Sequence, residues 1–154
     1  MGSYQFIMIF LVVAIIAIGI TGAVAVIHQQ GIEHEKKILD NILFQVGALI
    51  YEHYLLPVSY GGFGKSVLYM SENEDEIITL LPAYDDNMQE ILSLEDGFTN
   101  KGFKLKMWSN YWRKFAIGVR SKTYNFQRWL LVHCTSGQME IKSDPPVSTD
   151  FITQ

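Results

Sequence analysis

Four histidines, His28, His34, His53 and His133, are the side chains best suited to bind a metal ion. A helical zinc site uses two histidines four residues apart with a glutamate between them, so that both rings share one face. His28 and His34 are six residues apart and would lie on different faces of a helix. No histidine here stands in such an arrangement, and the sequence predicts neither a metal site nor a cofactor.

A glycine-rich stretch, GGFGKS at 61–66, is superficially similar to a phosphate-binding loop. That loop needs the spacing GxxxxGK[ST], preceded by a buried strand and followed by a helix. Gly61 lies only four residues before Lys65, one residue too close, and Ser66 opens an apolar alternating run. The stretch is therefore interpreted as a flexible link to a strand.

Nucleophilic and redox chemistry are equally poorly represented. Cys134 is the only cysteine, so the chain can form no disulfide within itself and contains no CxxCH haem site or paired-cysteine zinc motif. Its position in an alternating run favours a small apolar side chain packed inside a strand. No serine, cysteine or pair of acids stands in a catalytic arrangement, and we expect that the protein is not an enzyme.

The charged residues form two blocks. Between Glu72 and Asp96 there are nine acids and no Lys or Arg, whereas between Lys101 and Arg128 there are eight basic residues and no acid. Such blocks predict complementary surfaces that pair within the chain or between subunits. A DNA-binding face is a third use, because Trp, Tyr and Phe rings interleave with the basic residues. Aromatic residues of strands usually face the core, which favours the first two uses. The candidate contact charges are Glu74, Asp75, Glu76, Asp85, Asp86, Lys104, Lys106, Arg113, Lys114 and Arg120.

The element that must position these side chains begins with an apolar run, Phe6 to Ile27. Its 22 residues include no charge, and Thr21 is the only polar side chain. At about 1.5 Å per residue a helix of this length measures roughly 33 Å, close to the roughly 30 Å hydrocarbon core of a bilayer. The run therefore predicts a membrane-spanning helix. A net charge of −4 excludes a globally basic nucleic-acid binder.

The flanks of this run are unusual for a membrane anchor. MGSYQ carries no Lys or Arg, and the nearest basic residues are Lys36 and Lys37 on the far side. The positive-inside rule would place the Lys36 side in the cytoplasm, although Glu33 and Glu35 weaken this signal. A short basic leader removed before Met1 would explain the pattern, and this is our hypothesis.

The segment 28–56 keeps a helical period until Pro57, which ends the helix. Joined to the apolar run, it predicts a helix of about 50 residues, or roughly 75 Å. Gly19 and Gly22 are small residues of the kind that let neighbouring helices approach. The apolar stripe of the second half consists of Ile32, Leu39, Ile42, Leu43, Val46, Leu49 and Ile50.

After a glycine-rich connector at 57–65, the segment 66–143 is predicted to form a globular β domain. Short strands are expected at 66–70 and 76–81, followed by a helix over 86–95 that Asp85 or Asp86 could cap.

Period-two alternation further predicts four antiparallel strands, beginning at Phe103, Phe115, Phe126 and Gln138, and an irregular tail at 144–154. The expected fold class is α+β. A long N-terminal helix, with a membrane or filament-core half (1–27) and an amphipathic half (28–56), would pack on a small antiparallel sheet of about four strands.

This whole architecture resembles that of the type IV pilins. Ile7 to Ile20, IMIFLVVAIIAIGI, is similar to the apolar stretch that pilins expose after a prepilin peptidase removes their leader. Where the family commonly carries Glu, this chain has Gln5, counting from Met1, and a neutral amide cannot neutralise a terminal ammonium buried in a filament. The chain also lacks an initial Phe, a proline near residue 22 and a C-terminal cysteine pair.

The resemblance implies a structural subunit of an extracellular type IV pilus-like filament. The implied partners are identical subunits in a helical homopolymer, the prepilin peptidase, the inner-membrane assembly machinery, and the cytoplasmic membrane that anchors the subunit before assembly at the cell surface. A minor pilin, a secretion pseudopilin and a single-pass membrane-anchored extracytoplasmic binding domain are the alternatives. The residues implied in assembly are Met1, Gln5, Phe6, Phe10, Gly19, Gly22 and Ile27.

Overall fold

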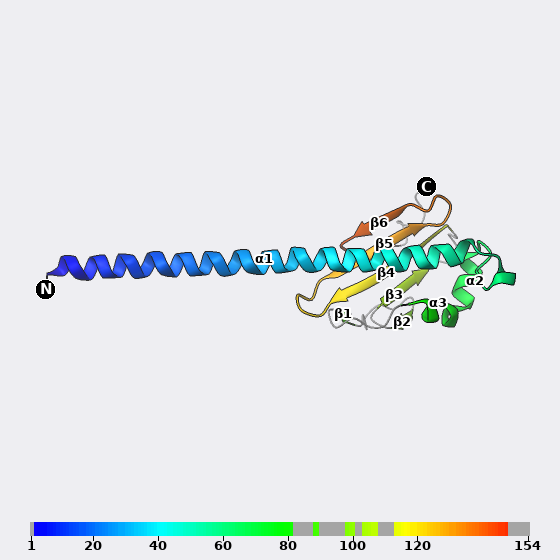
Figure 1. Ribbon diagram of the computed structural model, residues 1–154, viewed down its shortest axis with the longest axis horizontal. Coiled ribbons are helices and arrows are strands. Elements are labelled where there is room, and N and C mark those ends of the chain that lie inside the picture. The colour runs from blue at the N-terminus through cyan, green and yellow to red at the C-terminus, as the bar shows by residue number, and fades with distance from the viewer. Residues whose placement is uncertain (1, 82–87, 90–97, 101–102, 108–112, 148–154) are drawn as a thin grey trace. The chain divides into compact units, whose positions relative to one another are not determined.

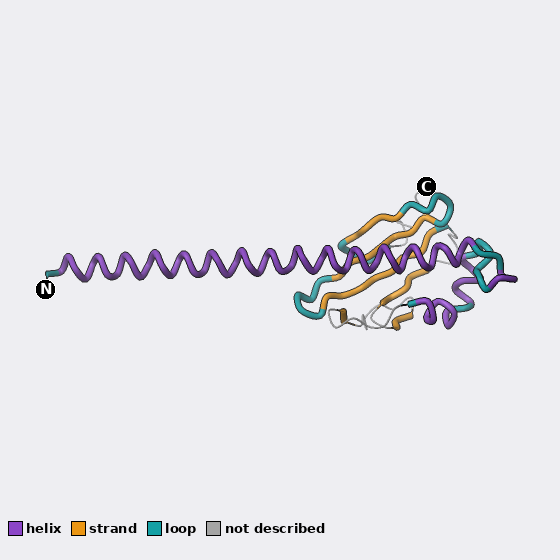
Figure 2. Tube along the Cα trace, viewed as in Figure 1, coloured by secondary structure: helices purple, strands orange, loops and turns teal. Residues whose placement is uncertain are grey.

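The computed structural model describes residues 2–81, 88–89, 98–100, 103–107 and 113–147. The chain divides into two compact units, Met1–Glu35 and Lys36–Gln154, called here the amino-terminal unit and the carboxy-terminal unit. Helix α1 (Ser3–Leu55) provides the helix of the amino-terminal unit and the first element of the carboxy-terminal unit (Figure 2). It ends two residues before Pro57, as the sequence predicts.

The carboxy-terminal unit is built on an antiparallel sheet with the strand order β2-β3-β4-β5-β6, while β1 pairs with β4 (Figure 1). The four predicted strands are confirmed as β3 to β6, of which β4, β5 and β6 also have described side chains. Two short strands, β1 and β2, were not expected. The strands are β1 (Met88–Gln89), β2 (Phe98–Asn100), β3 (Phe103–Met107), β4 (Lys114–Ser121), β5 (Gln127–His133) and β6 (Met139–Lys142).

The core of this unit lies between α1 and one face of the sheet. Helix residues spaced three and four apart meet alternate residues of β4 and β5, and full burial of each large apolar side chain stabilises the fold by roughly 1.5–3 kcal/mol. Gly47 lies on the same helix face, where an added Cβ would come within 2.3 Å of Leu130 Cδ2. Helix and sheet can approach this closely only because residue 47 has no side chain. The helix contributes Leu39, Leu43, Val46, Ile50 and Tyr54, and the sheet contributes Phe115, Ile117, Val119, Leu130 and Val132.

The strands predicted at 66–70 and 76–81 are wrong, because both segments are helical: α2 (Val67–Glu72) and α3 (Glu74–Leu80). Ser66 caps α2, its side-chain oxygen accepting a hydrogen bond from the Tyr69 amide at 3.1 Å. Val67 and Met70 are three residues apart and both buried. In so short an apolar segment this helical spacing cannot be distinguished from strand alternation.

The predicted link at 57–65 also differs from expectation, since it leads into a helix rather than a strand. Val58–Tyr60 form a 3₁₀ turn, η1, and Gly61 follows in the left-handed region with φ 78°. The buried Phe63 then donates its amide to the carbonyl of His53 at 2.9 Å. The connector is thus bonded back onto the end of α1.

The helix predicted at 86–95 is contradicted where the structure describes it. Met88 and Gln89 form β1, paired with Ser121 and Arg120 of β4, and the rest of that segment lies outside the described residues. A neighbouring strand with unpaired backbone groups supplies hydrogen bonds that override a weak local helical preference. Residues 144–147 of the predicted tail contain no helix or strand.

Strand β4 is buried along nearly its whole length, on both faces of the sheet. Ala116, on the face opposite the α1 core by alternation, has no exposed surface, and neither does Trp129 of β5. Trp129 is the register partner of Gly118, and an added Cβ there would lie 2.7 Å from the indole ring. Gly118 therefore provides the space that the large ring occupies.

Candidate functional site

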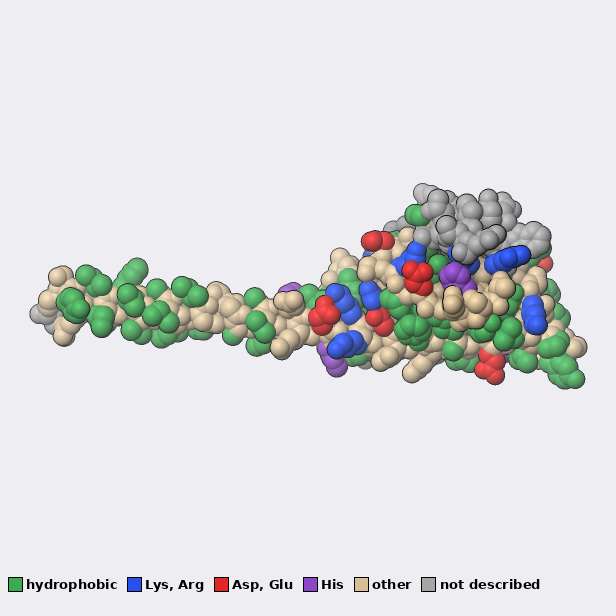
Figure 3. Space-filling view, turned by 90° about the horizontal axis from the view of Figure 1, so that it is seen from above, with side chains coloured by type: hydrophobic (Ala, Val, Ile, Leu, Met, Phe, Trp, Pro, Cys, Tyr) green, Lys and Arg blue, Asp and Glu red, His purple; other side chains and the backbone are tan. Residues whose placement is uncertain are grey.

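The surface of the amino-terminal unit is the first candidate site. Its helix is apolar and exposed: Phe6 retains 74% and Phe10 80% of its accessible surface, and hydrophobic side chains cover the face of this helix seen in Figure 3. Thr21 donates its hydroxyl to the carbonyls of Ala17 and Ile18, both at 3.0 Å, so its polar group is bonded within the helix. The helix therefore offers apolar contact on every side.

A surface of this kind is suited to lipid or to other apolar helices. Within a bilayer a helix satisfies its own backbone hydrogen bonds, so only side chains meet the surroundings. By length and composition α1 can cross a membrane, and the apolar 18-residue window that shows this is not buried within the structure. Phe6, Ile7, Phe10, Leu11 and Ala14 line a shallow apolar depression where side chains of another helix could pack.

The residues implied in assembly lie along this helix. The Gln5 amide donates to the carbonyl of Gly2 at 3.0 Å, within the first turn. Gly19 and Gly22 are open: an added Cβ at either position would meet no atom within 4 Å. Ile27 is exposed, while Met1 lies outside the described residues.

The acidic contact candidates fall on α3 and beyond it. Glu74, Asp75 and Glu76 form the first turn of α3, and Glu76 is exposed. The side chains of Glu74 and Asp75 lie outside the description, as do Asp85 and Asp86 entirely. The described part of the acidic block thus begins at a helix N-terminus, where the helix dipole favours negative charge.

The basic candidates lie on or beside two neighbouring strands. Register places Lys104 and Lys106 of β3 opposite Gly118 and Ala116 of β4. Arg113 is exposed just before β4, whereas Lys114 is buried. The guanidinium Nε of Arg120 is buried without a hydrogen-bond partner. The block is therefore not one exposed cationic surface.

The aromatic residues that suggested a DNA-binding face are likewise divided. Phe115 and Trp129 have no exposed surface, so neither ring can stack on a base. Tyr124 is half-buried, and Trp108, Tyr111 and Trp112 lie outside the described residues.

An ion pair between α1 and β5 was missed by the sequence. Arg128 donates from Nε to Asp40 Oδ1 and from Nη2 to Asp40 Oδ2, both at 2.7 Å, and from Nη1 to Ser143 Oγ at 3.0 Å. The side chains of Arg128 and Asp40 are only 16% and 24% exposed. This forked geometry is the strongest form of an Arg–carboxylate contact. No local sequence signal could indicate it, because the partners are 88 residues apart.

Two titratable groups of β5 and its end have shifted pKa values. Burial raises the pKa of the Cys134 thiol to about 12, which suppresses the reactive thiolate. Desolvation, followed by the charge of Lys114, lowers the pKa of His133. Among the described residues, no three His, Cys, Asp or Glu side chains are grouped so as to hold a metal ion.

Comparisons of the chain with protein-family models, with curated proteins and with solved structures give no match. The function must therefore be argued from the residues and geometry of the chain itself.

Proposed function

We propose that this protein is a non-enzymatic structural subunit of an extracellular type IV pilus-like filament, assembled through its N-terminal apolar helix. The observation that carries the proposal is the uncovered apolar surface of α1 in the amino-terminal unit. Such a surface requires lipid before assembly, and a bundle of like helices can replace lipid without exposing it to water. The sheet-packed half of the same helix supports a globular unit beside the filament-forming segment.

Partners of the proposed subunit are identical copies, a prepilin peptidase and an inner-membrane assembly machinery. The proposed location is the cell surface, with membrane anchoring before assembly. A single-pass anchored binding domain is the alternative, since the same apolar helix would serve as an anchor. The two accounts differ in whether helices of separate copies must pack against one another.

Electron microscopy of the surface-sheared fraction, with mass spectrometry of the filaments, tests the proposal directly. Thin helical fibres composed of this chain, processed at Met1, are the expected result. Absence of fibres, with the chain in the membrane pellet and a leader attached, would favour the anchored domain.

A variant pair separates packing from anchoring. Gly22→Leu keeps the helix apolar and meets no atom of its own chain, so membrane insertion should persist. The larger side chain would hold neighbouring helices apart, and fibres should be lost. Ile20→Leu is the matched control and should retain fibres. Normal fibres in Gly22→Leu would show that close packing at this glycine is not used.

A further inference from the structure

The carboxy-terminal unit contains a pocket that the filament proposal does not use. Its volume is about 460 Å³, within the range of roughly 300–1,000 Å³ typical of small-molecule sites. Three segments meet there: α1, the start of β5, and the chain that follows β6. The residues that line it are Lys36, Phe126, Gln127, Arg128, Ser143, Asp144 and Pro145.

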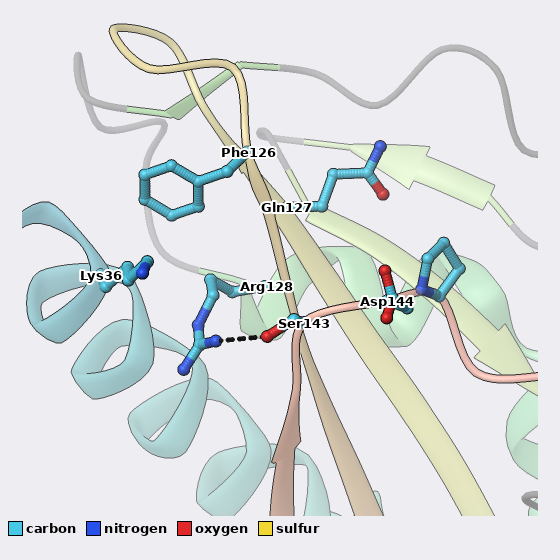
Figure 4. Close-up of a pocket in the computed structure, with 7 residues that line it drawn as sticks. Lys36, Phe126, Gln127, Arg128, Ser143 and Asp144 are labelled. Carbon is cyan, nitrogen blue, oxygen red and sulfur yellow. Dashed lines mark hydrogen bonds between the residues drawn. The ribbon is translucent and has the colours of Figure 1, made fainter. Parts of the chain in front are cut away.

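The walls of this pocket are held in place by contacts already described. Arg128 is fixed by the forked pair with Asp40 and by Ser143 Oγ, so its guanidinium joins all three segments. The Phe126 carbonyl accepts from the Ser121 amide at 2.8 Å, which closes the turn between β4 and β5. Figure 4 shows Phe126 and Arg128 on the side of β5 that faces α1, with Gln127 directed away. A site with such fixed walls loses little entropy when a ligand binds.

The lining combines apolar ring surfaces with hydrogen-bonding groups of both kinds. Phe126 and Pro145 present ring surfaces, Lys36 is a donor, and Asp144 is an acceptor. The cationic Lys36 and Arg128 are balanced by the anionic Asp144 and Asp40, which gives no net charge. A ligand with many hydroxyl groups and one apolar face matches this chemistry better than an anion does.

We infer that this pocket binds a neutral hexopyranose unit of a glycan. The C–H face of the sugar ring would pack against Phe126, while its hydroxyl groups would bond to Asp144, Ser143 and Lys36. This inference is independent of filament formation, because every residue it uses belongs to the carboxy-terminal unit.

Saturation-transfer NMR on the full chain, in lauryldimethylamine oxide micelles that contain no sugar head group, tests the inference. The probes are the methyl pyranosides of glucose, galactose and mannose, each titrated separately. At least one should receive saturation at its ring C–H protons. Inorganic phosphate and glucuronate, tested as competitors, should not displace it.

Two variants tie binding to the pocket. Asp144→Asn removes an exposed carboxylate and should weaken the affinity about three- to tenfold, the effect of one hydrogen bond. Phe126→Leu should weaken it similarly through loss of the flat ring, although Phe126 also packs against the core. The matched controls Glu140→Gln on β6 and Phe44→Leu on α1 lie outside the pocket and should bind normally.

Three results would overturn the inference. These are absence of saturation transfer to all three pyranosides, displacement of the sugar by phosphate or glucuronate, and unchanged binding in Asp144→Asn. Displacement by an anion would identify a site for acidic ligands instead.

Discussion

Leucines of a single helix have opposite environments in the two units. Leu11, in the amino-terminal unit, is 53% exposed, whereas Leu43, in the carboxy-terminal unit, has no exposed surface. Both lie in α1 and have the same helical propensity. The difference is that β4 and β5 present a complementary apolar face to Leu43.

The contrast shows where the stability of each unit originates. The carboxy-terminal unit buries its apolar side chains within the chain and gains hydrophobic free energy on folding. The amino-terminal unit leaves its apolar side chains exposed and can gain that free energy only from surroundings outside the chain. Paired substitutions in the two units can therefore break or sharpen the comparison.

Leu43→Ala should have the largest effect. Loss of a buried leucine leaves a cavity, and we expect the free energy of unfolding of the carboxy-terminal unit to fall by about 2–5 kcal/mol. Urea unfolding in detergent micelles, followed by tryptophan fluorescence, measures it. Leu11→Ala, the control in the other unit, should leave that transition unchanged; equal losses would refute the contrast.

Gly47→Ala should follow in size. The new methyl group would overlap Leu130 Cδ2, and the fully buried Leu130 has little room to move. Overpacking of this kind costs about 1–3 kcal/mol. The same urea unfolding assay applies. Adding Leu130→Val should restore part of the loss, whereas Gly22→Ala, in open space, should cause none; failure of the double variant to recover would argue against overpacking.

Asp40→Asn should have a smaller effect, about 1 kcal/mol, because an amide can still accept one hydrogen bond from Arg128 but lacks the charge. Thermal unfolding by circular dichroism would detect it as a lower Tm. Glu52→Gln, an exposed acid on the same helix, is the control. An equal shift in both variants would mean that the Asp40 contact adds no stability.

His133 should have the smallest effect. Its pKa in the fold is lowered below the ordinary value of 6.5, so the unfolded chain binds the proton more readily. Its contribution to stability should be constant above about pH 6.5 and decrease as the pH falls below that value. Urea titrations between pH 5 and pH 8 (about 25 °C) would show this decline, and His133→Gln should reduce it. An unchanged slope in the variant would assign the pH dependence to other groups.

Sequence reasoning succeeded where periodicity extends over many residues. The long helix was predictable because one apolar run and one amphipathic run end at Pro57. The strands β3 to β6 were predictable from alternation. The apolar surface at Phe6 and Phe10 required only composition.

It failed where the pattern is short or the contact distant. The segments from Ser66 to Leu81 contain too few apolar residues to distinguish helix from strand. The pair of Asp40 and Arg128 depends on tertiary structure alone, and so does the pocket beside it. Burial of Lys114 and Ala116 was unpredictable because alternation indicates only one covered face.

The connector after α1 also governs how that helix opens. The carbonyls of His53, Tyr54 and Leu56 accept from the amides of Phe63, Lys65 and Gly64 at 2.8–2.9 Å. These carbonyls would otherwise lack partners at a helix end and fray singly. Because one folded strap of chain holds all three, they must be released together. In hydrogen exchange, the amides of Phe63, Gly64 and Lys65 should therefore open as one cooperative unit.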